Sequence, residues 1–338
     1  MIIGFALSDT NNKRLFDYAD IKGEAHEIKA NNINPYLVDA ISVFLEKNRI
    51  TLQNNSPLMA KGSIPYDGGF LLFNEDEKNE FLSKEPQAQK FIRPFLGGEE
   101  FINNIKRYCL WLVDATPAEL KSMPLVMARL EEIKKSRSAS TRKITNELAA
   151  TPMLFGEIRQ PKTNYLAIPE VSSERRHFIP IGFLTPDIIA SNKLYTVSDA
   201  TIYHFGILTS TMHMAWTRTV CGRLKSDYQY SAGIVYNNFP WPMDVTDKQK
   251  KAIEDAAQAV LNARAAHVGA SLADLYDPLT MPPDLVKAHR ALDSAVDTAY
   301  SKRKFTGDSD RVAFLFDLYQ TLSAPLDIKK PKGKKKKP

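Results

Sequence analysis

Residues 164–184 have the sequence NYLAIPEVSSERRHFIPIGFL, in which two apolar runs flank a short polar turn. Strand-forming side chains dominate both runs, so the pattern predicts extended segments over residues 164–171 and 177–184. The turn between them contains Ser172, Ser173, Arg175 and Arg176. Serine hydroxyls and guanidinium groups at an exposed turn are typical donors to phosphate. An ordinary polar turn is the alternative.

The stretch that follows, residues 201–220, predicts a single helix. Its apolar side chains are spaced by three and four residues: Phe205, Leu208, Met212, Trp216 and Val220. Asp199 or Thr201 could cap this helix, and Gly222 could end it. His204 and His213 lie within it without a carboxylate at metal-ligand spacing, so we interpret both as structural histidines.

Helices and short extended segments alternate before residue 245, and helices alone follow it. The earlier part predicts extended segments over 2–7, 25–29 and 223–230, helices over 74–83 and 116–135, and an exposed basic loop over 134–143. Later, a capping box of Thr246 and Gln249 opens one helix, Pro283 opens a second, and residues 308–322 form a third. The expected fold class is α+β, a mixed α/β domain over 31–244 followed by a small helical bundle over 245–328.

Basic charge is concentrated at one end of the chain. The 338 residues include 45 Lys and Arg against 39 Asp and Glu, a formal net charge of +6. The tail, residues 329–338, holds seven lysines and no acid, so the remainder has 38 basic and 39 acidic residues. Net charge therefore does not identify a partner. We interpret the tail as a solvated, disordered end, with a weak phosphate tether as the alternative.

The composition excludes several classes of protein. Cys109 and Cys221 are the two cysteines of the sequence, and their wide separation excludes a disulfide scaffold or a cysteine-rich zinc site. No uncharged apolar stretch reaches the roughly 18–20 residues of a membrane span, and the N-terminus lacks the pattern of a signal peptide. We therefore expect a cytoplasmic protein without a membrane partner.

Catalytic motifs are mostly missing. The sequence has no phosphate-binding loop, no zinc-protease motif and no nucleophile elbow, and it offers no metal site. The turn Asn34-Pro35-Tyr36 approaches the Asn/Asp-Pro-Pro-aromatic turn of amino-methylating DNA enzymes, where the aromatic side chain stacks on a flipped base. Here the second proline is missing, and 33 residues are too few for a preceding cofactor-binding sheet. We assign no catalytic residue and expect no turnover from this chain alone.

A second polar pattern lies at residues 225–230, KSDYQY. Alternate side chains of an extended segment face the same way, so Lys225, Asp227 and Gln229 would share one face. Lysine can donate to guanine O6 and N7 while aspartate accepts from cytosine N4, which suits a G·C pair, and Gln229 could address an adenine or an adjacent base. A solvated strand edge with a local ion pair is the alternative.

Several longer motifs carry a family resemblance. They are TPMLFGEIRQP (151–161), VSSERR (171–176), YHFG (203–206), STMHMAW (210–216), CGRL (221–224), IVYNNFPWP (234–242), and upstream KRLFDY (13–18), NINPYLVD (32–39), RPFLG (93–97) and CLWLVD (109–114). Together they resemble the C-terminal half of the MmeI-like, type IIL restriction–modification enzymes and their methylase relatives. That family joins a nuclease, an adenine-N6 DNA methyltransferase using S-adenosylmethionine, a target-recognition domain and a helical C-terminus.

The resemblance implies that this chain holds the last two parts only. Residues 1–30 would be the trailing edge of a missing methyltransferase domain, and Met1 an internal methionine or the start of a truncated gene. This chain would then carry no cofactor. S-adenosylmethionine, and magnesium where a nuclease is present, would belong to the parent protein.

The resemblance also implies which side chains read double-stranded DNA. The base-reading pairs would be Glu170 with Asn192, Lys193 with Gln229, and Lys225 with Asp227. Glu170 fits a cytosine N4 acceptor. The expected phosphate contacts are Ser172, Ser173, Arg175, Arg176, Arg142 and Lys143.

Two functions from different classes follow. The first is sequence-specific DNA target recognition as the specificity part of an adenine-N6 methyltransferase, with that domain attached in cis or supplied as a subunit in trans. The second is a protein-interaction module, in which the helical region and the face around Trp216 dock a separate methyltransferase subunit and DNA contact is secondary. A complete enzyme built on Asn34-Pro35-Tyr36 is a third interpretation, which binding of S-adenosylmethionine would revive.

Overall fold

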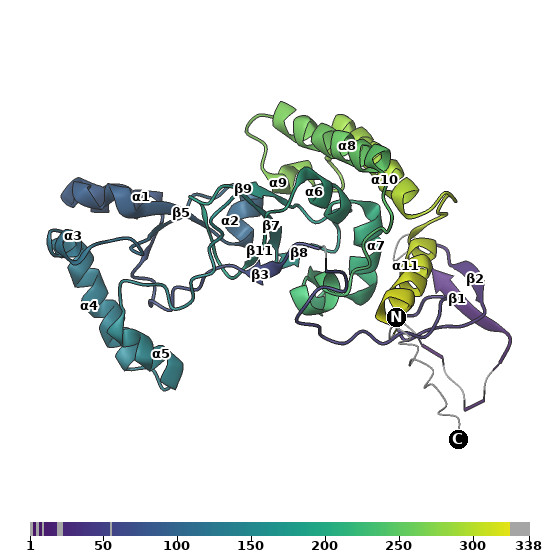
Figure 1. Cartoon of the computed structure of the whole chain (residues 1–338), viewed down its shortest axis with the longest axis horizontal. Helices are drawn as coiled ribbons and strands as arrows, with labels where there is room; N and C mark the ends of the chain where they lie inside the picture. Colours follow the sequence, from purple (N-terminus) through teal and green to yellow (C-terminus); the bar gives the residue numbers. More distant parts are fainter. Residues whose placement is uncertain (1–2, 5–6, 9, 19–22, 55, 325–338) are drawn as a thin grey trace, which may run out of the picture.

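The computed structural model describes residues 3–4, 7–8, 10–18, 23–54 and 56–324. The basic tail therefore lies outside the described residues. Within them, small sheets and helices form an elongated molecule with an arm at one end and a larger body at the other (Figure 1). This mixture confirms the α+β class. No described helix is long and apolar enough to cross a membrane.

The arm is built on the sheet with strand order β10-β5-β6-β4 and has its own apolar core. Its elements are β4 (Leu72–Phe73), α1 (Glu75–Lys84), a 3-10 helix (Pro86–Phe91), β5 (Ile92–Leu96), β6 (Tyr108–Leu110), α3 (Pro117–Lys121), α4 (Pro124–Ser138), α5 (Lys143–Glu147), a second 3-10 helix (Leu148–Ala150) and β10 (Ile189–Ala190). Thr116 caps α3 in a capping box with Glu119, at the predicted helix start. The predicted helix over 116–135 is nevertheless two helices, because Pro124 has no N–H with which to continue α3.

The prediction of an exposed basic loop over 134–143 is wrong at Arg137. This residue lies in the last turn of α4 and is only 1% exposed. Its guanidinium donates five hydrogen bonds of 2.7–3.0 Å to the backbone carbonyls of Pro65, Tyr66, Leu148, Thr151 and Leu154. All five N–H donors of the side chain are thereby used. Arg137 therefore fastens two distant loops to α4.

The centre of the molecule is an antiparallel sheet of order β3-β11-β7-β9. Its strands are β3 (Met59–Lys61), β7 (Tyr165–Pro169), β9 (Gly182–Leu184) and β11 (Leu194–Ser198), and α2 (Gly98–Asn103) packs beside β7. Every residue of β7 is buried, which explains its unbroken apolar sequence. The predicted strand over 177–184 is shorter than expected, because only its last three residues pair with β7.

A smaller sheet of order β12-β13-β8 lies at the edge of the body. It contains β8 (Val171–Ser172), β12 (Gly222–Leu224) and β13 (Asp227–Gln229). β12 and β13 form a hairpin around a turn at Lys225 and Ser226, and Lys225 has a φ of 56°. The prediction of one extended segment over 223–230 is therefore wrong at this turn.

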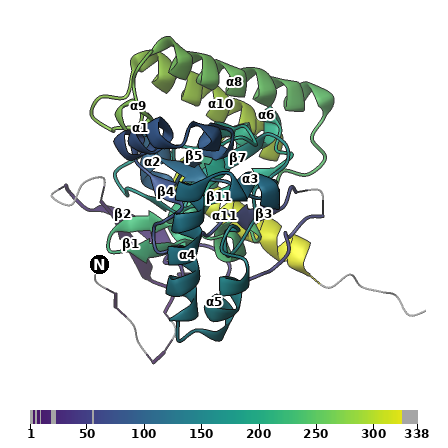
Figure 2. The same cartoon turned by 90° about the vertical axis from the view of Figure 1, so that its left-hand side faces the viewer.

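Helices enclose the rest of the body. They are α6 (Ile202–Leu208), α7 (Thr211–Val220), a π-helix (Ala232–Tyr236), α8 (Asp247–Ala266), α9 (Leu272–Leu275), α10 (Pro283–Tyr300) and α11 (Asp308–Ser323). The predicted single helix over 201–220 is two, because the Ser210 hydroxyl accepts the backbone N–H of His213 and begins α7 afresh. Thr201, rather than Asp199, caps α6. Figure 2 shows α8 lying along α10 above the central sheet.

The three predicted C-terminal helices are confirmed and share their core with the strands. Thr246 and Gln249 form the expected capping box at α8, and Pro283 opens α10. One continuous apolar cluster runs from β7 through α7 to α10 and α11. Trp216 is fully buried in it, 5.6 Å from the ring of Phe316 in α11. The helical region is therefore packed as an integral part of the body.

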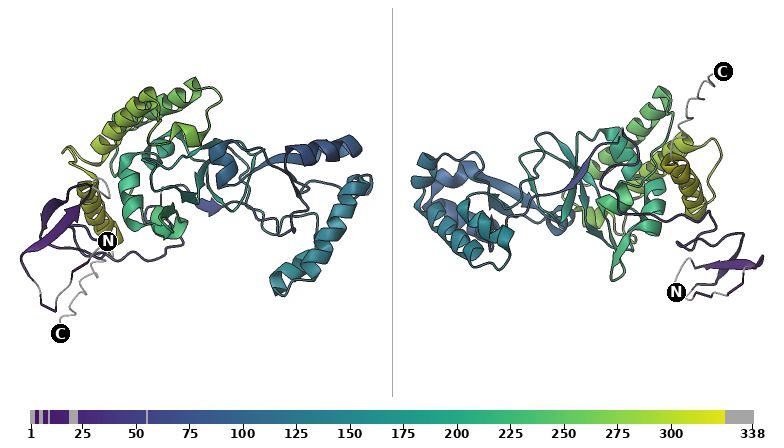
Figure 3. Two further views of the ribbon diagram at one scale, coloured as in Figure 1. Left: turned by 180° about the vertical axis from the view of Figure 1, so that it is seen from behind. Right: turned by 60° about the horizontal axis from the view of Figure 1, so that its bottom comes forward.

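The N-terminal stretch forms a hairpin of β1 (Lys13–Asp17) and β2 (His26–Ala30) at the same end of the molecule as α11 (Figure 3). β2 confirms the segment expected over 25–29. Of residues 2–7 the structure describes only 3, 4 and 7, and none of these is in a strand. The Asn34 side chain is buried in the next turn, where its oxygen accepts the N–H groups of Tyr36 and Val38 and its amide donates to the carbonyl of Ile41.

Candidate nucleic-acid interface

Three parts of the chain predicted to contact DNA meet at Glu170, between β7 and β8. Its backbone N–H donates to the carbonyl of Lys193 at 3.0 Å, and its own carbonyl accepts the N–H of Tyr230 at 2.8 Å. Tyr230 directly follows β13. The backbone of Glu170 thus links the loop before β11 to the hairpin of β12 and β13, and it fixes the relative positions of the predicted base-reading side chains.

The Glu170 carboxylate is held between two lysines. Its Oε1 atom lies 2.5 Å from Lys61 Nζ, and its Oε2 atom lies 3.3 Å from Lys193 Nζ. Burial acts to raise the pKa of Glu170, but the hydrogen bonds and charges of the two lysines outweigh it, so this pKa lies below its usual value. Glu170 is therefore an ionised hydrogen-bond acceptor at neutral pH.

Lys61 is the functional candidate that sequence reasoning missed. It is the last residue of β3, and the sheet register places it opposite Tyr195 in β11. Its ammonium group lies 5.5 Å from the centre of the Tyr195 ring. A three-residue strand 109 positions before Glu170 gives no motif or periodicity, so only the pairing of β3 with β11 reveals the contact.

The predicted base-reading side chains differ in their contacts and exposure. Lys193 forms an ion pair with Glu170. Asn192 is half-buried beside Lys193, and its backbone N–H donates to the carbonyl of Ser63. Lys225 sits exposed at the tip of the hairpin, so it does not share a strand face with Asp227 as predicted.

The residues around β13 alternate between buried and exposed side chains. Tyr228 and Tyr230 are buried, whereas Gln229 is exposed. The guanidinium of Arg223 lies 4.2 Å from the centre of the Tyr228 ring and covers it. Gln229 is therefore exposed and Asp227 half-buried, while the aromatic side chains between and after them are packed into the body.

The turn after β8 carries the predicted phosphate contacts, with one correction. Ser172 is 2% exposed, and its hydroxyl is shielded from solvent, so it is not available to a phosphate in this structure. Ser173 is half-buried and accepts the backbone N–H of Arg175 at 3.3 Å. The Arg175 side chain is exposed and that of Arg176 is half-buried. Burial lowers the pKa of Arg176, opposed by the charges of Asp227 and Asp277.

The remaining predicted phosphate contacts lie on the arm. Arg142 precedes α5 and Lys143 is its first residue, and both side chains are exposed. Lys143 lies 3.9 Å from Glu147 one helical turn later. Figure 1 places α5 at the far end of the arm, well separated from β8. The cationic side chains thus form two groups at different places along the molecule.

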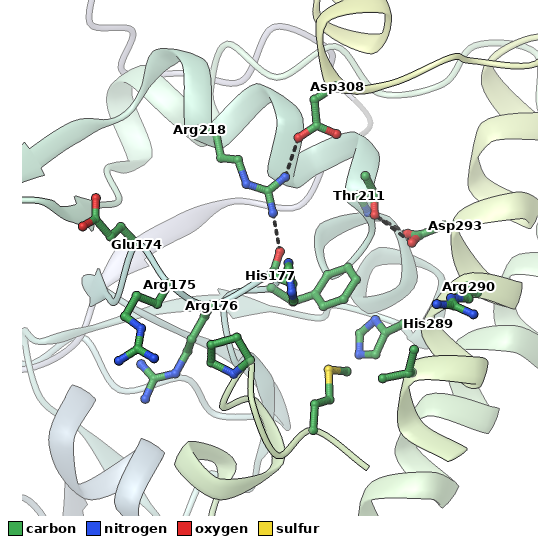
Figure 4. Close-up of a pocket in the computed structure, with 14 residues that line it drawn as sticks. Glu174, Arg175, Arg176, His177, Thr211, Arg218, His289, Arg290, Asp293 and Asp308 are labelled. Carbon is green, nitrogen blue, oxygen red and sulfur yellow. Dashed lines mark hydrogen bonds and ion pairs between the residues drawn. The ribbon is translucent and has the colours of Figure 1, made fainter. Parts of the chain in front are cut away.

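A cavity of about 620 Å³ lies behind the arginine turn (Figure 4). One wall is the turn of residues 174–178, and the opposite wall comes from α10 and the loop before it. Arg218 donates to the carboxylate of Asp308 and to the carbonyl of His177, each at 2.6 Å. These bonds attach the turn to α7 and α11.

Asp293 lies in the same cavity wall. Its carboxylate accepts the N–H and the hydroxyl of Thr211, each at 2.7 Å. Burial raises the pKa of Asp293 to about 6, although the two bonds from Thr211 act in the opposite direction. The cavity wall therefore contains a carboxyl group that titrates near neutral pH.

The buried histidines have structural partners. A ring nitrogen of His213 lies 3.0 Å from the Tyr230 hydroxyl, and His289 stacks on Phe178 and lies 2.8 Å from the Tyr276 hydroxyl. Burial lowers the pKa of each to about 3. His204 accepts the N–H of Thr201 at the start of α6. The described residues contain no group of three metal-ligating side chains.

Two family profiles match this chain. The profile of the family described as "MmeI, target recognition domain" matches residues 39–243, and that of "MmeI, C-terminal domain" matches residues 245–327. The chain belongs to the MmeI family. The resemblance inferred from the motifs is thereby confirmed.

Two relatives show the extent of the likeness. DNA methyltransferase A of Bacillus subtilis (strain 168) is 41% identical over 324 residues, which cover 96% of this chain. The solved structure of the type IIL restriction–modification enzyme MmeI in complex with DNA is 48% identical, with a TM-score of 0.87 over 94% of this chain. This MmeI-family chain spans 36% of the length of the first protein and 42% of the second.

Proposed function

We propose that this chain is the part of an MmeI-type restriction–modification enzyme that recognises a specific DNA sequence. The observation that carries the proposal is the close structural likeness to MmeI, which was solved in complex with DNA. The polar side chains described above provide the chemistry. They project from short strands and turns whose backbones are fixed by a buried core.

The hairpin of β12 and β13 is proposed to enter the major groove. Lys225 at its tip donates to guanine O6 and N7, Asp227 accepts from cytosine N4, and Gln229 reads an adjacent base. Glu170 with Asn192 reads a second position, and Lys193 acts together with Gln229. A nearly neutral protein can still read bases, because acidic side chains accept hydrogen bonds from cytosine N4 while basic side chains donate to guanine.

Phosphate contacts are proposed at both groups of cationic side chains. Arg175 and Arg176, with Ser173, bind the backbone beside the hairpin, and Arg142 and Lys143 bind it at the end of the arm. Such contacts set the position of the protein on the duplex and make its affinity depend on salt.

Catalysis is assigned to a methyltransferase domain outside this chain, joined in cis or supplied in trans. S-adenosylmethionine would provide the methyl group there, and magnesium would serve a nuclease. The amide oxygen of Asn34 already accepts two backbone N–H groups of its own turn, so in this conformation it is not placed to act on a target amine. We place the protein in the cytoplasm and retain the proposed division at residues 30, 244 and 328.

The docking interpretation loses one of the two surfaces on which it was based. Trp216 is 0% exposed and packs between α7 and α11, so no tryptophan-rich face is available to a partner. DNA recognition therefore remains the function that the geometry supports best.

The test is selection of bound duplexes from a random pool at physiological salt, using the full chain and a version ending at residue 328. An enriched motif containing a G·C pair that Lys225→Ala or Asp227→Ala scrambles would support the proposal. Lys248→Ala, an exposed lysine on α8, is the control and should leave the motif unchanged. A wild-type chain that enriches no motif would argue against DNA reading by this part alone.

A further inference from the structure

We propose that Arg218 and Asp308 are positioning residues for DNA binding, which hold the turn of residues 173–178 in place. This inference rests on the proposed function, in which Arg175 and Arg176 of that turn contact phosphates. Arg218 lies in α7, and Asp308 is the first residue of α11. The C-terminal helical region would thereby contribute to DNA affinity through a side chain that does not itself touch the duplex.

The turn has little regular structure of its own. Residues 173–181 belong to neither a strand nor a helix. The backbone N–H of Arg176 donates to the carbonyl of Ser173 at 3.2 Å, and the Ser173 hydroxyl accepts the N–H of Arg175 at 3.3 Å. Both bonds lie within residues 173–176. The position of the turn relative to the body therefore depends on its contacts with other elements.

The far end of the turn is held by Arg218. The guanidinium of Arg218 donates to the backbone carbonyl of His177 at 2.6 Å. The next residue, Phe178, is buried, and its ring stacks on that of His289 with 4.0 Å between the ring centres. The bond from Arg218 therefore fixes the backbone at the point where the exposed turn enters the core.

Arg218 is in turn oriented by Asp308. A second nitrogen of the guanidinium donates to the Asp308 carboxylate at 2.6 Å, so Arg218 lies between this carboxylate and the turn (Figure 4). Because a guanidinium is planar and rigid, the bond to Asp308 also sets the direction of the N–H group that reaches His177. Asp308 lies 3.8 Å from Arg311, which is paired with Asp297 of α10 at 2.6 Å. The turn is thus connected through Arg218 to α7, α11 and α10.

The two arginines of the turn are available to phosphates. Within the part of the chain that the structure describes, neither Arg175 nor Arg176 forms an ion pair. Ordering a side chain on binding costs conformational entropy, and a backbone that is already fixed lowers this cost. Loss of the anchor at His177 should therefore weaken the phosphate contacts and reduce the number of counterions that binding releases.

The experiment measures the affinity of the full chain for a labelled duplex of random sequence at several salt concentrations. Asp308→Ala is the decisive variant, because removing an acidic residue ordinarily strengthens binding to DNA. If Asp308 positions the turn, the variant should instead bind roughly threefold to tenfold more weakly, within the range for residues that act on a site through others. Its salt dependence should also be flatter than that of the wild type. Asp308 is 43% exposed, and such ion pairs contribute little to stability, so the variant should fold.

Asp310→Ala is the matched control. It removes another paired acidic residue of α11, whose partner is Arg303 at 2.8 Å, and it should not weaken binding. Hydrogen exchange without DNA gives a second readout. Exchange over residues 173–178 should increase in Asp308→Ala but not in Asp310→Ala.

Combined variants separate positioning from direct contact with DNA. Asp308→Ala added to the double variant Arg175→Ala with Arg176→Ala should bind no more weakly than that double variant, because Asp308 acts only through the two arginines. Arg218→Met should likewise weaken binding in the wild-type background and have no further effect in the double variant. A direct contact of Arg218 with DNA would weaken binding equally in both backgrounds.

The outcomes distinguish the two proposals. A wild-type chain that binds no duplex at any salt concentration overturns the proposed function and this inference with it. Weakened binding by the double variant, together with equal or stronger binding by Asp308→Ala, overturns this inference alone. Equal losses for Arg218→Met with and without the two arginines of the turn also overturn it. So does a double variant that binds as the wild type does, and in that case a selected motif would still support sequence recognition.

Discussion

The Oδ1 atom of Asp227 accepts a hydrogen bond from the backbone N–H of Glu174 at 3.2 Å. This bond joins the hairpin proposed to read bases to the turn that carries Arg175 and Arg176. The segment proposed to read bases and the segment proposed to contact phosphates are therefore joined by a hydrogen bond, and substitutions at Asp227 can separate their effects.

Asp227→Ala and Asp227→Asn should differ in their effects. Alanine removes both the base acceptor and the bond to Glu174, so it should relax one base preference and also weaken the phosphate contacts. Asparagine keeps an oxygen for Glu174 but adds an amide donor, so it should change the base preference alone. Selection of duplexes measures the first effect, and the salt dependence of affinity measures the second. Identical salt dependence in the two variants would contradict a role for the bond.

Arg175→Ala with Arg176→Ala should weaken binding without changing the selected sequence. Each phosphate contact contributes about −0.9 to the slope of log affinity against log salt, so losing two should flatten that slope by about 2. Titrations of labelled duplex at several salt concentrations measure it. Lys248→Ala should leave the slope as it is, and an unchanged slope in the double variant would place the DNA backbone elsewhere.

Arg137→Met should destabilise the arm by about 3 kcal/mol or more. The change leaves five backbone carbonyls without their donor, and a buried unsatisfied polar group costs about 1–3 kcal/mol. Hydrogen exchange should increase over residues 148–154 while the body stays protected. Lys134→Met, an exposed site on the same helix, is the control. Equal protection in both variants would show that Arg137 is not needed to hold the loops.

Asp293→Asn should stabilise the protein more at pH 8 than at pH 5. Because burial raises the pKa of Asp293 from 3.8 to about 6, its protonation favours the folded state below pH 4, and that contribution is lost as the pH rises through about 6. Asparagine stays neutral at every pH, so the gain at pH 8 should be about 2–3 kcal/mol. Chemical denaturation at the two pH values measures it. The exposed Asp255→Asn should show no such difference, and equal gains at both pH values for Asp293→Asn would refute the assignment.

Local physics made the helix starts predictable. Two helices begin with capping boxes, formed by Thr116 with Glu119 and by Thr246 with Gln249, which bond N–H groups of the first turn. A third begins with Pro283, which has no N–H group to leave unpaired. All residues that fix these helix starts lie within one turn of the sequence. The break before α7 was missed, although Ser210 is itself a capping residue, because the apolar spacing continues across it.

Contacts between distant segments were not predictable in this way. Lys61 contacts Glu170 only because β3 pairs with β11. The basic residues around Arg137 predict an exposed side chain, whereas Arg137 is buried and bonded to five backbone carbonyls. Lys225 was misplaced because its turn contains neither glycine nor asparagine to signal a positive φ. Motif resemblance singled out Glu170 and Asp227, but it contained no sign of their contacts with Lys61 and with the backbone of Glu174.

The ion pair of Lys61 with Glu170 has a consequence for how specificity changes during evolution. A basic residue at position 170 would face Lys61 and Lys193 together, so a single substitution there would bring three cations into a half-buried site. An exchange of Glu170 for a basic residue should therefore be accompanied by a change at position 61. Among proteins of this family, the residues at positions 61 and 170 should covary. An acidic residue at one position should be accompanied by a basic residue at the other.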